Sequence, residues 1–276
     1  MNPIKVMMNG IPGNVVVTIT RHLLGDDRFR LIPYALTGPE ITGETMDIDG
    51  HRIELIRPDH RQAAIDSIKA EEGTFISADF THPSAVNSNA NFYCQNHLPF
   101  VMGTTGGDRQ QLHAAVAASD VSAVIAPNMA KQIVGFQAIM EYGAQTFPDL
   151  FKGYSLKIRE SHQEGKADTS GTAKAMIAYF NAMGIPFTEA MIEQERDPAV
   201  QKDQWHIPEA YLPGHAWHTY TLASEDETVS FEFTHNINGR DIYAQGALDG
   251  IAFLHKKLED NVTGKIFTMI DVLKGA

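Results

Sequence analysis

One 14-residue segment, residues 160–173, concentrates the side chains best suited to acid–base chemistry. It reads Glu-Ser-His-Gln-Glu-Gly-Lys-Ala-Asp-Thr-Ser-Gly-Thr-Ala. His162 can exchange a proton near neutral pH, and Lys166 can donate a proton or pair with a carboxylate. Asp168 is close enough in sequence to orient Lys166 or to fix the loop that carries it. The segment therefore predicts a site that holds a small dianion and protonates it.

The flanking sequence predicts the elements that position these side chains. Residues 155–162 have the pattern of a strand whose polar end leaves the core, and residues 171–183 have the pattern of a helix with Ser170 as its N-cap. The N–H groups near Gly171 and Thr172 would carry partial positive charge and suit one carboxylate. Taken alone, the segment could equally be an ordinary capped helix beside a surface lysine and histidine.

A second group of candidate residues lies in a glycine loop near the start of the chain. The loop joins an expected strand at residues 5–9 to an expected helix at residues 13–24, where a dinucleotide's pyrophosphate would meet a helix N-terminus. Val16 stands where the third glycine of the G-x-G-x-x-G pattern would be, so a plain strand-to-helix turn is the alternative. The candidate cofactor-binding residues here are Gly10, Ile11, Pro12, Gly13, Asn14 and Val15.

Three further strand ends carry turn residues that would face one crevice. Ligands of open α/β sheets bind outside the carboxyl ends of the strands. Small donors after one of these strands would suit a carboxamide or a ribose. Each turn alone could be structural, but together they favour a nucleotide site. The candidate residues are Phe80, Gly103, Thr104, Thr105, Ala126, Pro127, Asn128 and Met129.

The choice of nucleotide depends on the end of the second expected strand, residues 30–36. An acidic residue there would hydrogen-bond the ribose 2′-hydroxyl of NAD. Thr37 is neutral and does not repel a 2′-phosphate, which mildly favours NADPH, but no arginine or lysine is expected beside it to bind one. Both NADPH and NADH therefore stay open.

The order of the expected elements indicates an α/β fold of two parts. The first 126 residues alternate strands with helices, which predicts a doubly wound, Rossmann-like parallel sheet. After about residue 130 the pattern predicts a mixed sheet with helices on one face, including an antiparallel hairpin. Strands are expected at residues 5–9, 30–36, 53–56, 74–80, 99–103, 122–126, 155–162, 218–223 and 228–236, and helices at 13–24, 83–96, 109–118, 132–147, 171–183 and 247–258.

Composition limits the classes of partner. A net charge of −12 and a pI near 5.4 argue against non-specific nucleic-acid binding, and no polybasic patch or long apolar run indicates a membrane partner. The single cysteine, Cys94, fits a reducing cytosol, and no signal peptide is visible, so a cytoplasmic location is expected. His215, His218 and His235 lack the tight spacing of metal ligands, so no metal is expected.

The 160–173 segment and the crevice motifs together resemble dihydrodipicolinate reductase in its plant-like form. The resemblance continues through residues 214–220, 231–236, 239–244 and 264–273 and covers nearly the whole chain. It implies a dinucleotide-binding domain of residues 1–130 and 241–276, and an α+β substrate-binding and oligomerisation domain of residues 131–240. It also implies a homotetramer, and the plastid stroma would be the location of a processed plant-type protein.

The resemblance further implies a reaction and residue roles. The family uses NADPH or NADH to reduce dihydrodipicolinate, formed from hydroxy-tetrahydrodipicolinate, to tetrahydrodipicolinate in lysine and diaminopimelate biosynthesis. His162 and Lys166 match the family's acid/base pair, and residues 103–105 and 126–129 match the nicotinamide contacts. Gln163 departs from the bacterial pattern and would hydrogen-bond substrate without charge. The implied substrate-binding set is Thr104, Gln163, Lys166, Ser170, Gly171 and Thr172, and Thr37 and Phe80 join the cofactor-binding set.

Two other functions stay open. A related reductase acting on another cyclic imine dicarboxylate would share this signature, because the signature contacts carboxylates more than the ring. A non-catalytic nucleotide-binding homologue would keep the same fold, since fold alone does not confer activity. The retained His162 and Lys166 argue against the second alternative.

Overall fold

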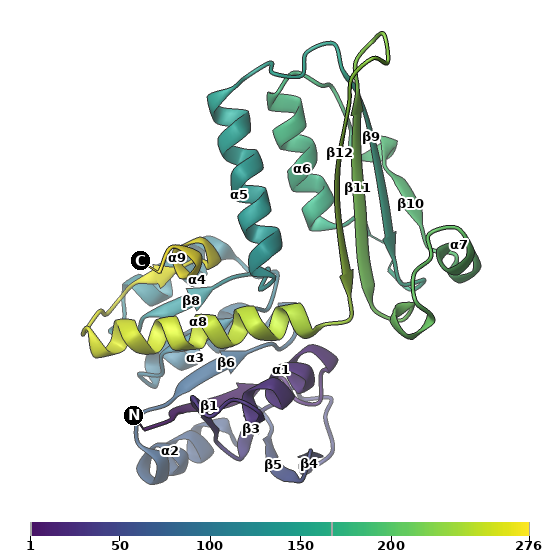
Figure 1. The fold of residues 1–276 in the computed structure, drawn as a ribbon. Coiled ribbons are helices and arrows are strands. Elements are labelled where there is room, and N and C mark those ends of the chain that lie inside the picture. The colour runs from purple at the N-terminus through teal and green to yellow at the C-terminus, as the bar shows by residue number, and fades with distance from the viewer. Residues whose placement is uncertain (1, 167, 276) are drawn as a thin grey trace. The chain divides into compact units, whose positions relative to one another are not determined.

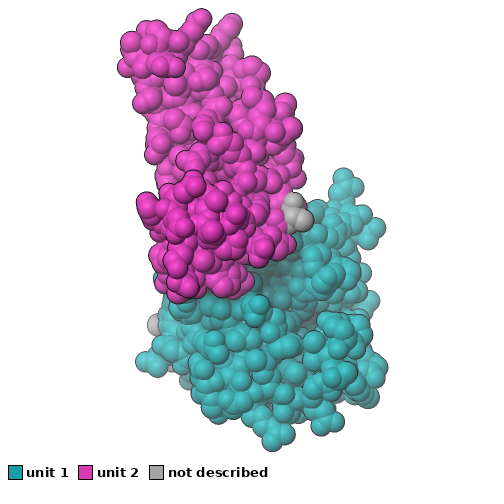
Figure 2. Space-filling view, turned by 90° about the vertical axis from the view of Figure 1, so that its right-hand side faces the viewer, with its two compact units in different colours: residues 1–131, 241–276 teal, residues 132–240 magenta. Residues whose placement is uncertain are grey.

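The computed structural model describes residues 2–166 and 168–275, which divide into two compact units (Figure 1). Unit 1 comprises the described residues up to Lys131 and from Asp241 onward, and unit 2 comprises residues 132–240. Figure 2 shows unit 1 in teal and unit 2 in magenta. No helix among the described residues has both the length and the apolarity that crossing a bilayer requires. The functional roles expected for the two parts stay predictions.

Unit 1 is built on a six-stranded parallel sheet, which confirms the predicted fold class. Its central strands are buried along their whole length because helices cover both faces, as is usual for parallel sheets. From one edge to the other the strands are β13 (Ile266–Phe267), β8 (Ala123–Ile125), β7 (Phe100–Met102), β6 (Ile76–Asp79), β1 (Ile4–Asn9) and β2 (Phe29–Leu31).

Two pairs of helices cover the faces of this sheet (Figure 1). On one face α1 (Asn14–Leu24) packs beside α8 (Asp241–Glu259); on the other, α3 (Val86–Gln95) packs beside α4 (Arg109–Ala117). The close approach of α8 needs a glycine, because a methyl group at Gly246 would overlap the Met129 carbonyl. The remaining helices of the unit are α2 (Arg61–Glu72), α9 (Met269–Lys274) and a 3₁₀ turn (Pro83–Ala85).

The strand expected at residues 30–36 is two strands that belong to different sheets. β2 ends at Leu31, whereas β3 (Tyr34–Leu36) pairs with β5 (His51–Ile56), and β5 pairs in turn with β4 (Thr45–Ile48). Pro33 separates the two strands, since it has no N–H to donate to a ladder. The prediction of one continuous strand was therefore wrong.

Unit 2 has the expected mixed sheet with helices on one face. The strand order is β10 (Glu193–Glu195), β9 (Ser155–His162), β11 (His215–Ala223) and β12 (Ser230–Asn238), and the pairing of β10 with β9 is parallel. Helices α5 (Lys131–Thr146) and α6 (Gly171–Ala182) lie on one face of this sheet (Figure 1). Ile158, Phe180 and Tyr220 are fully buried between helices and sheet.

Several short elements were not predicted from the sequence. They are β4, β10, β13, α9, α7 (Pro198–Asp203) and the 3₁₀ turns at Glu189–Met191 and Glu209–Tyr211, and the longer helix α2 was not predicted either. Elements of two to six residues are too short to display a hydrophobic period. The start of α7 does carry a local signal, because the Asp197 side chain accepts hydrogen bonds from the N–H groups of Ala199 and Val200, and Pro198 is the first helical residue.

Candidate active site

The glycine loop borders a cavity of about 1040 Å³ within unit 1. Gly10 has a φ of 105°, and a methyl group added to it would overlap the Phe80 carbonyl, so only glycine fits there. Gly13 is the N-cap of α1, which brings the loop to a helix start. This arrangement fits a phosphate group, since helix N-termini and exposed loop N–H groups favour anions.

The other candidate residues of this loop differ in their exposure. Ile11 is buried, and its carbonyl accepts a hydrogen bond from Thr37 Oγ1 at 2.8 Å. Pro12 lines the cavity, and Asn14 and Val15 lie in the first turn of α1, exposed and half-buried respectively. The Thr37 hydroxyl therefore fixes the glycine loop against the end of β3.

A buried carboxylate ties together two strand ends of unit 1. Asp79 Oδ1 accepts hydrogen bonds from Thr104 Oγ1 at 2.7 Å and Thr81 Oγ1 at 2.9 Å. Asp79 Oδ2 accepts from Tyr93 at 2.7 Å and Asn89 at 2.9 Å, so both oxygens of this buried group have hydrogen-bond donors. The Thr104 hydroxyl also accepts from the Thr81 N–H at 2.9 Å. The Thr104 hydroxyl is therefore used by the fold, which leaves the main chain of this turn to meet a ligand.

The turns after β7 and β8 carry the other candidate cofactor residues. Gly103 lies so close to the Phe80 ring that an added methyl group would overlap it. Asn128 Oδ1 accepts a hydrogen bond from the Ala130 N–H at 2.9 Å, which fixes the turn before α5. Among the remaining candidates, Ala126 and Met129 are buried, whereas Thr105 and Pro127 are exposed.

The structure also supplies a basic residue at the nucleotide cavity. Arg61, the first residue of α2, lines the same cavity as Thr37, whereas the sequence showed no arginine or lysine next to Thr37. The two residues are 24 positions apart in sequence. Pairing of β3 with β5 brings them to one side of unit 1, and this pairing is not visible in the sequence.

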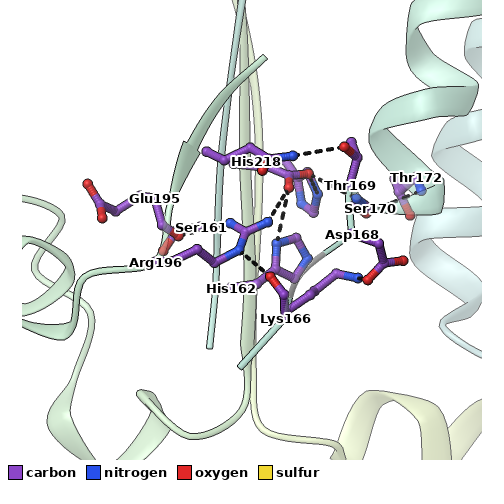
Figure 3. Close-up of polar contacts among 12 residues, drawn as sticks. Ser161, His162, Lys166, Asp168, Thr169, Ser170, Thr172, Glu195, Arg196 and His218 are labelled. Atoms are coloured by element: carbon purple, nitrogen blue, oxygen red, sulfur yellow. Dashed lines mark hydrogen bonds and ion pairs between the residues drawn. The ribbon is translucent and has the colours of Figure 1, made fainter. Parts of the chain in front are cut away.

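In unit 2 the acid–base candidates lie at the end of β9 and in the loop that follows it (Figure 3). His162 is the last residue of β9 and is buried. Lys166 Nζ donates to Asp168 Oδ1 at 2.6 Å, and this hydrogen bond holds the pKa of Asp168 below its usual range. Ser170 caps α6 as predicted, because its Oγ accepts from the Thr172 N–H at 3.2 Å. Of the other candidates, Gly171 is exposed, and Gln163 and Thr172 are half-buried.

Glu160 is the centre of the charged contacts in this site. Its fully buried carboxylate lies 2.6 Å from Arg196 Nη2, 3.8 Å from His162 Nδ1 and 3.7 Å from His218 Nε2. The Ser170 N–H also donates to it, at 3.3 Å. Burial alone would raise the pKa of Glu160, but the adjoining His218 and Arg196 lower it to about 2. The carboxylate is therefore charged at neutral pH.

Two residues that the sequence did not single out hold the main chain of the acid–base pair. Arg196 Nε donates to the Lys166 carbonyl at 3.0 Å, so one guanidinium connects Glu160 to the lysine loop (Figure 3). Gln201, fully buried on α7, donates to the His162 carbonyl at 2.7 Å. The helix start at Asp197 and Pro198 was the signal that could have drawn attention to this region.

The protonation of His162 is set by its surroundings. Burial lowers the pKa of His162 to about 3; nearby His218, Arg196 and Lys166 act in the same direction, and Glu160 opposes them. The His162 and His218 rings meet edge to face with centroids 5.0 Å apart. His162 is therefore neutral in the free protein at physiological pH, and an anion bound beside it would favour its protonated form.

Glu160, His162 and His218 also present ligand atoms that all lie within 4.8 Å of one another. Such a group can hold a metal ion in other settings. Here Arg196 already lies 2.6 Å from the carboxylate, and its fixed positive charge opposes a second cation. The charge of Arg196 therefore disfavours a metal ion here, and the cluster remains the candidate site for acid–base chemistry.

Comparison with known proteins places the chain in a family. It matches the family models "Dihydrodipicolinate reductase, N-terminus" over residues 4–129 and "Dihydrodipicolinate reductase, C-terminus" over residues 133–273. A relative from Oryza sativa subsp. japonica, named probable 4-hydroxy-tetrahydrodipicolinate reductase 1, chloroplastic, is 46% identical over 245 residues, 89% of this chain and 71% of the relative. The Arabidopsis thaliana protein named 4-hydroxy-tetrahydrodipicolinate reductase 2, chloroplastic, is 42% identical over 273 residues, 99% and 78% of the two chains.

A solved structure shares the fold. The dipicolinate-bound dihydrodipicolinate reductase from Paenisporosarcina sp. TG-14 superposes with a TM-score of 0.65 at 19% identity, covering 96% of this chain and 97% of that one. A nucleotide-binding, Rossmann-type unit joined to a unit with a mixed sheet and a buried acid–base site defines an oxidoreductase of two-part architecture. The chain belongs to the dihydrodipicolinate reductase family, as the resemblance predicted.

Proposed function

We propose that this protein reduces dihydrodipicolinate, formed from 4-hydroxy-tetrahydrodipicolinate, to tetrahydrodipicolinate in lysine and diaminopimelate biosynthesis. The observation that carries the proposal is a cluster beside the capped start of α6, in which Glu160 faces His162 and Arg196 and the Arg196 guanidinium also bonds the Lys166 carbonyl. This arrangement offers proton-transfer groups and anion-binding donors within one unit. The rice and Arabidopsis relatives are named for this activity.

Unit 1 is the proposed site of NADPH or NADH. The residues fit a dinucleotide, because Gly10 and Gly103 keep space that a methyl group would fill and the cavity of about 1040 Å³ is of ligand size. When bound, the reduced nicotinamide supplies the hydride. The proposed cofactor contacts are Gly10, Ile11, Pro12, Gly13, Asn14, Val15, Thr37, Phe80, Gly103, Thr104, Thr105, Ala126, Pro127, Asn128 and Met129.

Unit 2 is the proposed site of the dicarboxylate. At the first turn of α6, Gly171 would bind one carboxylate through its main-chain N–H and Thr172 through its hydroxyl, since the Thr172 N–H already donates to Ser170 Oγ. Gln163 and Ser170 add polar contacts, and Thr104 of unit 1 stays in the proposed substrate-binding set. Lys166 Nζ donates the proton that accompanies hydride transfer, and Asp168 holds that ammonium in place until the dicarboxylate binds.

His162 has a separate role in this proposal. It is neutral in the free protein, and the dianionic substrate would supply the negative charge that stabilises its protonated form. A protonated His162 would then offset substrate charge and exchange a proton with it. Glu160 lies 3.8 Å from Nδ1 of the ring and is charged at neutral pH.

The proposal is tested by following oxidation of NADPH and of NADH with dihydrodipicolinate generated in the assay. Turnover with this substrate supports the proposal. Turnover with another cyclic imine dicarboxylate alone would identify the related reductase, and nucleotide binding without turnover would identify the non-catalytic homologue. Either of the last two results would overturn the proposed reaction.

We also propose a homotetramer, and a cytoplasmic or plastid-stromal location. Large exposed apolar side chains on unit 2, including Ile139 and Tyr142 of α5 and Phe231 of β12, support self-association through this unit. The rice and Arabidopsis relatives are named as chloroplastic. Light scattering on the purified protein tests the assembly, and a monomer would contradict it.

A further inference from the structure

The fold brings a guanidinium to the end of the nucleotide cavity where a dinucleotide's adenosine ribose would lie. Leu36 of β3 stands opposite Ile56 of β5, and the Thr37 N–H donates to the Ile56 carbonyl at 2.9 Å. The chain that leaves β5 therefore starts beside Thr37 and enters α2 five residues later. Arg61 opens that helix and lines the cavity together with Thr37.

Arg61 is a cation that forms no ion pair with any carboxylate in the described parts of the chain. Its guanidinium packs over the ring of Phe92, 4.4 Å from the centroid, and Phe92 is itself buried on α3. This contact holds the half-buried side chain in place without neutralising its charge. An ordered, unneutralised guanidinium at a cavity wall is suited to a phosphate group.

An acidic residue faces the same cavity. Glu40 also lines it, and its carboxylate folds back against the Cα of Gly38, directly after Thr37. A carboxylate at this point can accept a hydrogen bond from a ribose hydroxyl and would repel a 2′-phosphate. Arg61 and Glu40 therefore act in opposite directions on the same part of a nucleotide.

We propose that Arg61 binds the 2′-phosphate of NADPH and is the residue that discriminates NADPH from NADH, with Glu40 reducing that preference. The inference rests on the proposed use of a nicotinamide dinucleotide in unit 1. The discriminating group is the 2′-phosphate, because it carries most of two negative charges that NADH lacks. The planar guanidinium of Arg61 can donate two parallel hydrogen bonds to it.

The test is a binding cycle with two nucleotides that differ in this phosphate alone, 2′,5′-ADP and 5′-AMP, measured by calorimetry on the full-length protein. Arg61→Gln should weaken 2′,5′-ADP by roughly 10- to 100-fold, as expected for loss of hydrogen bonds to a charged group, while 5′-AMP changes by less than about twofold. Arg57→Gln is the matched control. Arg57 is exposed, lies four residues earlier and does not line this cavity, so its removal should change neither affinity.

Two further measurements sharpen the result. Glu40→Gln should strengthen 2′,5′-ADP binding and leave 5′-AMP unchanged or weaker, because it removes repulsion of the phosphate and an acceptor for the ribose. Arg61→Lys should keep part of the preference, since the charge stays and the paired donors are lost. Equal weakening of both nucleotides in Arg61→Gln would show that Arg61 stacks on adenine instead, and would overturn the proposal.

The cycle separates this inference from the proposed reaction. Nucleotide affinities are measured without substrate, so a protein that binds 2′,5′-ADP through Arg61 but fails to reduce dihydrodipicolinate would contradict the reaction alone. Conversely, a protein that reduces dihydrodipicolinate equally well with NADPH and NADH, both as the wild type and as Arg61→Gln, would contradict the role of Arg61 alone.

Discussion

A single buried carboxylate lies at the centre of the charged contacts in the candidate active site. Glu160 contacts Arg196 and faces both His162 and His218, and its neighbours keep it ionised. Because the positive charge of Arg196 already offsets the negative charge of Glu160, Glu160 stabilises a protonated His162 only weakly. In the proposed reaction, Lys166 therefore supplies the positive charge that a dianionic substrate first meets.

Replacing Lys166 tests its role directly. We expect Lys166→Ala to lower kcat by roughly 10²- to 10⁴-fold, the usual contribution of a positioned proton-transfer group. Cofactor affinity should be retained, because Lys166 belongs to the loop of unit 2. Lys174→Ala is the control, since Lys174 is an exposed lysine paired with Glu189 at 2.9 Å. A kcat for Lys166→Ala equal to that of the wild type would remove Lys166 from the mechanism.

The hydroxyl of Thr172 tests the carboxylate site at the start of α6. We expect Thr172→Val to weaken substrate binding by about 1.5–3 kcal/mol, the worth of one hydrogen bond to a charged group. The cofactor KM should stay the same, and Thr172→Ser should recover most of the loss because it restores the hydroxyl. Steady-state kinetics with each component varied separately gives both constants. A raised cofactor KM with an unaltered substrate KM would speak against the assignment.

At the scale of elements, β10 and α7 hold the loop that carries Lys166. Arg196 follows β10 and bonds both Glu160 and the Lys166 carbonyl, while Gln201 of α7 bonds the His162 carbonyl. Neither element contributes a residue to the motifs that were identified in the sequence. In the proposed reaction they hold the main chain at His162 and Lys166, because Gln201 and Arg196 donate hydrogen bonds to the carbonyls of these two residues.

Removing Arg196 should therefore cost both stability and activity. Arg196→Gln leaves the charge of Glu160 buried and unbalanced, and we expect the free energy of unfolding to fall by about 3–5 kcal/mol. The double variant Glu160→Gln with Arg196→Gln should regain part of it, because no uncompensated charge remains. Urea unfolding of both variants, with Lys157→Gln as an exposed control on β9, measures this. Equal losses in the single and double variants would mean that the ion pair is not the cause.

Whether an element could be predicted depended on its length and on whether residues near it in the sequence determine its structure. The strand at residues 155–162, the cap at Ser170 and the pairing of Lys166 with Asp168 follow from local sequence and were predicted correctly. Arg61 and Arg196 were missed because strand pairing brings each of them to its site. The pairing of β3 with β5 does so for Arg61, and the pairing of β10 with β9 does so for Arg196. The break at Pro33 was overlooked because the residues on both sides of it favour extended structure.

At the scale of the whole molecule, buried histidines make stability depend on pH. Burial lowers the pKa values of His162 and His235 to about 3, from an ordinary value of 6.5. Below about pH 6.5 the unfolded chain binds these protons and the folded chain does not, so the stability present above pH 6.5 is lost as pH falls towards 3. Glu160, with its lowered pKa, adds a loss in the same direction below about pH 4.5.

We expect the free energy of unfolding to fall by about 1.4 kcal/mol per pH unit for each such histidine in the middle of this window. Urea titrations at several pH values between 7 and 4 measure the slope. His235→Leu should flatten it, because one of the histidines with a lowered pKa is gone. A slope unaffected by that substitution would show that His235 does not take up its proton on unfolding.

The path of the chain through the two units has a consequence for synthesis on the ribosome. Residues 132–240 form unit 2 without interruption, whereas unit 1 needs α8 and β13, which are translated after every residue of unit 2. Domains generally fold as their sequences emerge. Unit 2 is thus the first part of the chain with all of its residues available. Until residues 241–276 leave the exit tunnel, the sheet of unit 1 has five of its six strands, and its α8 side and its β8 edge are uncovered. A nascent chain stalled at residue 240 would expose the surface of unit 1 that α8 and β13 otherwise cover. We expect chaperones to bind such a chain.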